Sequence, residues 1–344
     1  MSDEATCEFA PEACLEALQK EAPLRLAFRP ERDYATWRIQ VREALGELLG
    51  KTPEVVPLDV RIQSETAHEG FHETRFVFTA ERHADVPCHL LRPARASGPV
   101  PVMICLQGHS TGMHISLGRP KYEGDDKSIA GGRAIALQAI AHGYAALVLE
   151  QRCFGERSDA RPESRRGNKG TCHHAAMNSL LLGRTMIGER VWDVRRAIDA
   201  LAGFDGLDMA RIGCMGNSGG GTITYFSACM DERIAAAMPS CYVCTFRDSI
   251  GKIDHCACNY IPRILEYFEM GELSCLIAPR PLVVVAGEHD PIFPIAAVRE
   301  TYALIERIYA AAGAPDRCRL VVGPEGHRFY PAEAWPVFQA LTDW

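Results

Sequence analysis

The chain has 344 residues, of which 47% are hydrophobic and 24% charged, and its formal net charge is −7. This composition is typical of a globular protein whose core is large enough to fold without cross-links, and it excludes a disordered or collagen-like chain. The acidic balance argues against nucleic acid as a partner, because nucleic-acid binders carry basic patches. The sequence contains no apolar run of about 18 residues or more, so we expect no membrane-spanning segment.

The N-terminus and the cysteines indicate a reducing compartment. The first 20 residues are acidic and show neither the basic nor the apolar region of a secretory signal, so we expect a cytoplasmic protein. The 14 cysteines are irregularly spaced, and several lie inside apolar runs, which favours reduced thiols packed as small hydrophobic side chains. We expect an N-terminal helical extension at residues 1–54, packed on a catalytic domain at residues 55–344.

Three hydrophobic patterns follow one another along the chain. Residues 11–50 are expected to be helical, because apolar residues recur about every 3.6 positions up to Gly50. From about residue 55 to residue 91, alternation of apolar and polar residues predicts half-buried antiparallel strands. Beyond Pro99, continuous apolar runs alternate with helical patterns, which indicates a mostly parallel sheet with helices on both faces. The expected strands are 102–106, 145–149, 212–215, 234–238, 282–286 and 320–322, and the expected helices are 130–142, 183–201, 219–230 and 295–312.

Three segments are too long to be plain connections between these elements, namely 107–130, 151–180 and 240–275. Long loops at the carboxyl ends of parallel strands are where α/β folds place their functional sites. The third segment is rich in cysteine and aromatic residues, and we expect it to form a lid insertion.

Residues 212–221 predict a strand that runs through G-x-S-x-G into a helix. The glycines permit a sharp turn with Ser218 at its tip, and the N–H groups that follow can bind an anion. Asp290 comes just after the strand expected at 282–286, and His327 comes just after the last strand. The order serine, aspartate, histidine is that of the α/β-hydrolases, so the sequence predicts a catalytic triad.

Each of these residues has a chemical role in such a triad. Ser218 needs a base to become nucleophilic, and His327 would supply it, while Asp290 would fix the histidine tautomer and stabilise its charged form. The tetrahedral intermediate needs two donors, for which we expect the backbone N–H groups of Gly219 and His109. The expected substrate contacts, from the same loops, are Gln107, Arg152, Phe154, Tyr242 and Tyr260.

The segments 107–109, 216–220, 287–290 and 326–327 resemble those of the dienelactone hydrolase and acetyl xylan esterase groups of α/β-hydrolases, and the resemblance extends over about residues 70–344. It implies the α/β-hydrolase fold and a cofactor-free serine hydrolase of small carboxylic esters, with acetylated carbohydrates or small metabolites among its substrates. The chain departs from that group at Gly219, where the acetyl esterases carry glutamine. Ser218 stands where the dienelactone hydrolases use cysteine.

Other readings of the sequence remain open. A hydrolase of amides, thioesters or C–C bonds would use the same triad, and a hydrolase-fold protein could bind a ligand without catalysis. The string from His68 to His72 matches the zinc motif H-E-x-x-H, but its central glycine and flanking strands favour a hairpin turn. A second zinc hypothesis joins five residues of the lid segment, namely Cys241, Cys244, His255, Cys256 and Cys258.

We expect the four cysteines to be packed thiols rather than parts of a metal site, and we expect no bound metal or cofactor. The expected partner is a small-molecule ester, with homo-oligomer formation left open.

Overall fold

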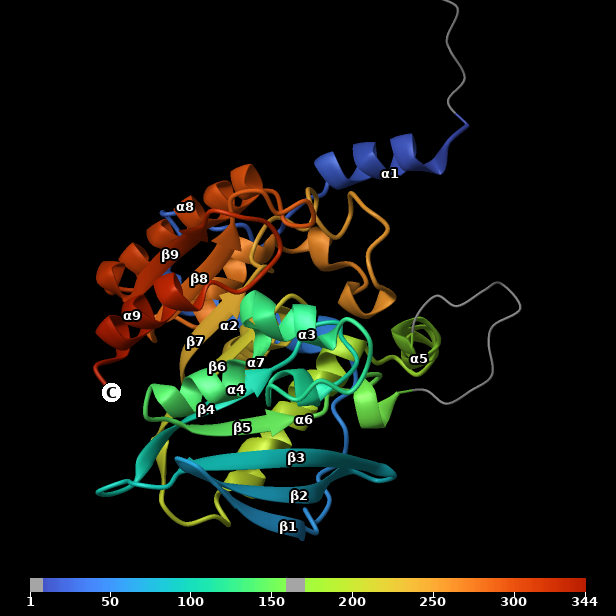
Figure 1. Ribbon diagram of the computed structural model, residues 1–344. Coiled ribbons are helices and arrows are strands. Elements are labelled where there is room, and N and C mark those ends of the chain that lie inside the picture. The colour runs from blue at the N-terminus through green and yellow to red at the C-terminus, as the bar shows by residue number, and fades with distance from the viewer. Residues whose placement is uncertain (1–8, 159–170) are drawn as a thin grey trace, which may run out of the picture.

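The computed structural model describes residues 9–158 and 171–344, and a nine-stranded sheet lies at the centre of that part of the chain (Figure 1). Its strands are β1 (Arg61–His68), β2 (Phe71–Glu81), β3 (Ala84–Pro93), β4 (Val100–Leu106), β5 (Ala145–Leu149), β6 (Leu207–Asn217), β7 (Ile234–Ser240), β8 (Leu282–Gly287) and β9 (Cys318–Gly323). Their order is β1-β2-β3-β5-β4-β6-β7-β8-β9. The pairs β1–β2, β2–β3 and β3–β5 are antiparallel. The strands from β5 to β9 in the sheet order are parallel to one another. The mostly parallel sheet predicted from the continuous apolar runs is therefore confirmed.

Helices cover both faces of the sheet. Consecutive strand residues point to opposite faces, so Ile104 packs in one hydrophobic core and its neighbour Met103 in the other. The first core is closed by α2 (Tyr34–Leu49), α6 (Met186–Leu201), α7 (Gly219–Met230) and α8 (Ile295–Ala311). The second is closed by α4 (Ile135–Ala141) and α9 (Pro331–Thr342). No helix among the described residues is long and apolar enough to cross a membrane.

The N-terminal region differs from the continuous helix expected at residues 11–50. It forms α1 (Pro11–Lys20) and α2, and residues 21–33 between them are not helical. Pro23 and Pro30 explain the break, because proline lacks the N–H that a helix interior needs. Asp33 then caps α2 by accepting a hydrogen bond from the Thr36 N–H at 2.9 Å.

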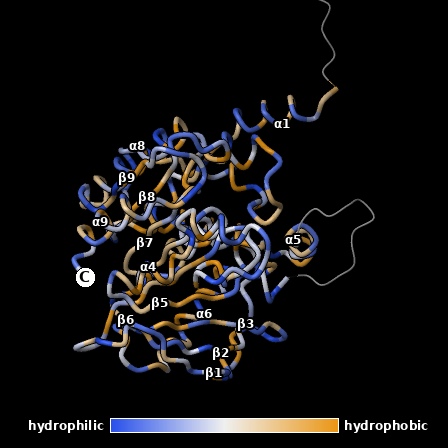
Figure 2. The backbone as a smooth tube through the Cα atoms, viewed as in Figure 1, coloured by the Kyte–Doolittle hydropathy of each residue, from blue (hydrophilic) through white to orange (hydrophobic). Residues whose placement is uncertain are grey.

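The two N-terminal helices are packed differently. α2 buries Trp37 and Val41 in the first core, whereas α1 buries none of its side chains and projects from the body of the protein (Figure 1). Hydrophobic and hydrophilic residues alternate around the turns of α1 (Figure 2).

The three long segments contain more regular structure than the sequence predicted. The first includes the short helix α3 (Asp125–Ser128), and the second ends in α5 (Thr171–Leu181). The segment 240–275 includes η4 (Ala257–Asn259), η5 (Ile264–Glu266) and most of η6 (Met270–Leu276). Its exposed residues all lie between 251 and 263, because residues such as Phe268 and Leu273 belong to the first core. The lid expected at 240–275 therefore stays a prediction, and its solvent-exposed part is residues 251–263.

Candidate active site

Ser218 stands at a strained turn between β6 and α7. Its φ and ψ of 58° and −122° are unfavourable for a residue with a side chain, and such strain is a known feature of exposed nucleophiles. Glycine is required on both sides of it, because a Cβ at Gly216 or Gly220 would overlap the carbonyl oxygen of Leu106. The G-x-S-x-G sequence thus folds into the strand–turn–helix arrangement that it predicts.

Asp290 and His327 form a hydrogen-bonded pair at the ends of β8 and β9. Oδ2 of Asp290 lies 2.7 Å from Nδ1 of His327, and its Oδ1 accepts hydrogen bonds from the N–H groups of Ile292 (2.9 Å) and Phe293 (3.2 Å). Burial alone would raise the pKa of Asp290, but the His327 ring and these two N–H groups outweigh burial and lower it. The carboxylate is therefore charged and holds the imidazole by Nδ1, which leaves Nε2 to other partners.

Ser218 lies at the same edge of the sheet as this pair. Its N–H donates to the carbonyl oxygen of Ser240 at 2.8 Å, and the next residue, Cys241, has its sulfur within 4.8 Å of a carboxylate oxygen of Asp290 and a ring nitrogen of His327. Burial raises the pKa of Cys241 to about 12, so its thiol is neutral at physiological pH. The structure thus places Cys241 beside the three predicted triad residues.

The two predicted oxyanion donors are neighbours. A Cβ at Gly219 would lie 2.8 Å from Nδ1 of His109 and 3.5 Å from its backbone nitrogen. Gly108 lies against the turn at Ser218 (the nucleophile elbow), because a Cβ at Gly108 would come within 3.1 Å of the Ser218 Cβ. The His109 ring therefore occupies the space that a side chain at position 219 would need.

Gln107 is bound by a buried carboxyl group that the sequence did not reveal. Its Nε2 donates to Oε1 of Glu150 at 2.6 Å, and the Met113 N–H donates to both oxygens of Glu150 at 3.0 and 3.2 Å. Burial raises the pKa of Glu150 to about 7. Glu150 therefore ties together the loop that carries His109, and the substrate contact expected for Gln107 stays a prediction.

The other predicted substrate contacts fall into two groups. Near the site, Phe154 is buried with its ring edge-on to His109 at 5.0 Å between centroids, and Tyr242 packs against Phe293 at 5.7 Å. Farther out, the half-exposed Tyr260 donates to the carbonyl oxygen of Ile250 at 3.0 Å. With Leu15 and Leu18 it lines a cavity between α1 and the lid.

Arg152 is held by three carboxylates, those of Glu81 (2.7 Å), Glu189 (3.0 Å) and Asp193 (2.8 Å). Its guanidinium group is thus engaged inside the fold, an arrangement that does not favour the predicted contact with substrate.

His255 lies near the candidate active site, although the sequence analysis considered it only as a possible zinc ligand. Its ring lies 5.8 Å from that of Phe293, which stacks on the His327 ring at the same centroid distance. Nδ1 of His255 contacts Nδ2 of Asn259 at 3.1 Å, whereas its Nε2 is buried without a hydrogen-bond partner. Burial, with His109 and His327 nearby, lowers the pKa of His255 to about 4, so the ring is neutral. A neutral imidazole with an unused nitrogen is suited to bind a polar group of a ligand.

The two zinc hypotheses do not form as the sequence grouped them. His68 and Phe71 flank the two-residue turn of the β1–β2 hairpin, which is the predicted turn, and Nε2 of His68 binds Glu73 at 2.7 Å. In the segment 240–275, Cys241 lies beside Asp290 and His327, whereas Cys256 and Cys258 lie beside His109 and Cys172 of α5.

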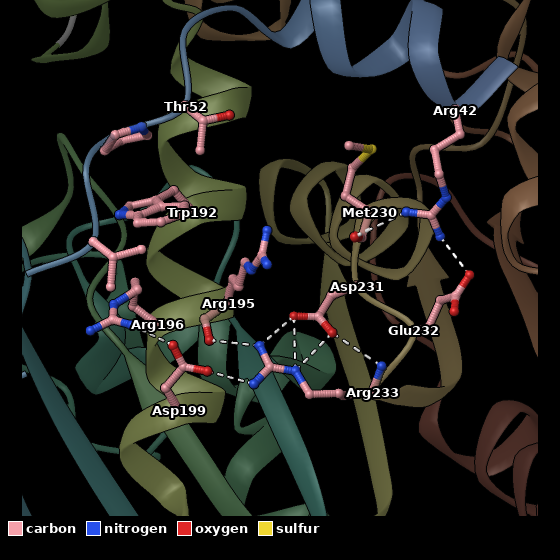
Figure 3. Close-up of a pocket in the computed structure, with 12 residues that line it drawn as sticks. Arg42, Thr52, Trp192, Arg195, Arg196, Asp199, Met230, Asp231, Glu232 and Arg233 are labelled. Carbon is pink, nitrogen blue, oxygen red and sulfur yellow. Dashed lines mark hydrogen bonds and ion pairs between the residues drawn. The ribbon is translucent and has the colours of Figure 1, made fainter. Parts of the chain in front are cut away.

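A charged cavity of about 710 Å³ lies at the opposite edge of the sheet (Figure 3). Within it, Arg233 pairs with Asp199 at 2.5 Å and with Asp231 at 2.6 Å, and Arg42 pairs with Glu232 at 2.7 Å. Residues 231–233 precede the first residue of β7, whereas Ser218, Asp290 and His327 follow the last residues of their strands. The cavity is thus distinct from the candidate active site.

The sheet order, the strained serine after β6 and the Asp290–His327 pair after β8 and β9 define the protein as an α/β-hydrolase. The chain belongs to the Abhydrolase family, whose model matches residues 11–324. It is 27% identical over 298 residues to YtaP of Bacillus subtilis (strain 168), provisionally named a hydrolase, with 84% of this chain and 94% of YtaP covered.

Solved structures share the fold at lower identity. A protein of Bacteroides fragilis NCTC 9343, provisionally named an acetyl xylan esterase, matches with a TM-score of 0.76 and 18% identity, covering 98% of this chain and 86% of its own. The glucuronoyl esterase from Solibacter usitatus matches with a TM-score of 0.70 and 16% identity, covering 93% of this chain and 96% of its own.

Proposed function

We propose that the protein is a serine esterase that hydrolyses small carboxylic esters through an acyl-enzyme intermediate. The observation that carries the proposal is the hydrogen-bonded Asp290–His327 pair at 2.7 Å, at the sheet edge where the strained Ser218 also stands. The family membership supports hydrolysis, and the acetyl xylan and glucuronoyl esterases among the structural neighbours support an ester as the substrate.

The first half of the reaction forms the acyl-enzyme. Oγ of Ser218 attacks the ester carbonyl carbon while Nε2 of His327 accepts its proton, and the Asp290 carboxylate stabilises the resulting imidazolium. The negative oxygen of the tetrahedral intermediate accepts hydrogen bonds from the N–H groups of Gly219 and His109. The intermediate then collapses, and the leaving alcohol takes the proton from His327.

Water completes the cycle. It attacks the acyl carbonyl while His327 again accepts a proton, which passes to Ser218 as the carboxylic acid leaves. This sequence of steps consumes one water and needs no cofactor.

The walls of the site favour a short acyl group on a polar alcohol. Phe154 and Tyr242 are bulky, buried side chains close to His109 and Phe293, and they limit the space for an acyl chain. The unpaired Nε2 of His255 can hydrogen-bond a hydroxyl or carbonyl group on the leaving alcohol. We therefore propose acetyl or similarly short esters of hydroxylated alcohols, including acetylated sugars, as the substrates.

The test is kcat/KM along p-nitrophenyl esters from acetate to palmitate, with Ser218→Ala as the background control. We expect a maximum at chains of about two to four carbons, because a pocket enclosed by Phe154 and Tyr242, as proposed, would exclude longer ones. Release of acetate from acetylated xylose at a rate above the Ser218→Ala background is also expected. A maximum at octanoate or longer would contradict the enclosed pocket.

A further inference from the structure

Four side chains with metal-binding atoms converge next to the candidate active site. They come from three separate parts of the chain: His109 follows β4, Cys172 is in α5, and Cys256 and Cys258 flank the start of η4 in the lid. One ring nitrogen and three sulfur atoms all lie within 4.8 Å of one another. Nε2 of His109 is 3.1 Å from the Cys258 sulfur, which is 3.3 Å from the Cys256 sulfur.

We propose that His109, Cys172, Cys256 and Cys258 together bind one Zn²⁺ ion. Zinc bonds of about 2.3 Å to sulfur and 2.0 Å to nitrogen, arranged as a tetrahedron, place nitrogen about 3.5 Å from each sulfur and the sulfurs about 3.8 Å from one another. The N–S separation of 3.1 Å and the S–S separation of 3.3 Å are each shorter than these values by about 0.5 Å, so the ligands need to move apart only slightly to take up the ion. Three cysteines and one histidine complete four-coordination, so the site is closed and structural in kind.

The surroundings suit a zinc–thiolate centre. Arg190 is buried, and its guanidinium nitrogens lie 3.4 Å from the Cys258 sulfur and 3.3 Å from the Cys172 sulfur. Three thiolates around Zn²⁺ carry one net negative charge, which this cation neutralises. Groups that hydrogen-bond the ligands in this way commonly tune metal sites.

Simple packing of thiols does not account for this arrangement. These cysteines share a small hydrophobic cluster with Phe154 and Ala176. Purely apolar packing would exclude the imidazole of His109 and the charged Arg190 from among the sulfurs. Cys244, in the same lid segment, shows the alternative: it is buried in the first core, away from the four converging side chains. The proposal therefore departs from the sequence-based expectation of no metal.

A zinc ion at this position would fasten the three long segments to one another. α5 already packs against η4, and His109 would join both to the loop after β4. If His109 supplies an oxyanion N–H, as the proposed function holds, the metal also fixes that donor. Loss of the ion should then lower kcat by about tenfold or more while KM changes little.

The first test is the zinc content of full-length protein, purified with a reductant from zinc-supplemented cells. We expect about one zinc per chain in the wild type and in the matched control Cys244→Ser, and on the order of a tenth of that in Cys256→Ser and Cys258→Ser. Cys172 is a weaker choice for mutation, because Cys153 hydrogen-bonds it and could replace it as a ligand. A wild type without zinc, iron in its place, or zinc retained in both lid variants would overturn the proposal.

Cobalt provides a second measurement, in case a lid variant folds poorly. Wild-type protein stripped with a chelator and loaded with Co²⁺ should show thiolate-to-cobalt charge-transfer bands and the visible bands of tetrahedral cobalt. Absence of these bands from folded protein would contradict the site.

Zinc content does not depend on turnover, so Ser218→Ala should retain the metal. Failure of the esterase assignment would therefore leave this result unchanged. Loss of zinc with unaltered kcat would overturn the positioning role of the metal.

Discussion

Two histidines stand near the same elbow in opposite chemical surroundings. His327 is held through Nδ1 by one charged carboxylate at 2.7 Å, and the thiol nearest to it, Cys241, is kept neutral by burial. His109 instead lies among three thiols, with Arg190 beside two of them. A single carboxylate partner orients a ring that must gain and lose protons, whereas convergent thiols fix a ring in place. The comparison supports the proposal that His327 transfers protons and that His109 is held in position.

The largest expected effect is that of removing the nucleophile, which should abolish turnover without affecting the zinc site. Ser218→Ala should lower kcat by about 10⁴–10⁶-fold, because the variant lacks the hydroxyl proposed to form the acyl-enzyme. The variant should keep its circular dichroism spectrum and the zinc content of the wild type. More than about a tenth of wild-type turnover would refute the nucleophile, since triads lose orders of magnitude without it.

A smaller effect is expected when the partner of His327 changes. Asp290→Asn should lower kcat by up to about 10⁴-fold, because an amide at this position favours the wrong histidine tautomer. The matched control is Glu288→Gln, which changes a nearby acid whose side chain pairs with Arg299 on the surface at 2.8 Å. Steady-state kinetics should show the control near wild type. A control more impaired than Asp290→Asn would identify Glu288 as the triad acid.

The smallest effect concerns the carboxyl group of Glu150, which binds the loop that carries His109. Burial raises the pKa of Glu150 from 4.5 to about 7, so the folded protein binds this proton more tightly than the unfolded chain does. Its contribution to stability is full below pH 4.5 and is lost as the pH rises through 7.

Glu150→Gln has no such proton to lose. Its free energy of unfolding relative to the wild type should therefore improve by about 3 kcal/mol between acidic and neutral pH, measured by denaturant titration across the range. The exposed Glu47→Gln serves as control and should show no such trend. A difference between Glu150→Gln and wild type that is independent of pH would contradict the assignment.

The parallel sheet could be predicted because a strand buried on both faces leaves a continuous apolar run. β5 and α7 begin and end at the predicted residues, 145–149 and 219–230. α9 was missed, since Pro336 stands inside it and its helical pattern is short. The helix predicted across residues 21–33 was wrong, because prolines override a hydrophobic stripe.

The candidate site, like the fold, has parts that the sequence predicts and parts that it does not. The strained elbow around Ser218 and the pairing of Asp290 with His327 follow from motifs at strand ends, where the chain nearby fixes the geometry. The grouping of His109 with Cys172 depends on how three long segments pack, and no spacing in the sequence encodes that contact. For the same reason Glu150 and His255 gave no sequence signal of their surroundings.

The assignment of Ser218 as the nucleophile is tested most directly by a fluorophosphonate probe followed by peptide mass mapping. A single phosphonyl adduct on Ser218 of the wild type is expected, with no adduct on Ser218→Ala. An adduct on another residue, such as Cys241 beside His327, would contradict the assignment, as would ester turnover without labelling.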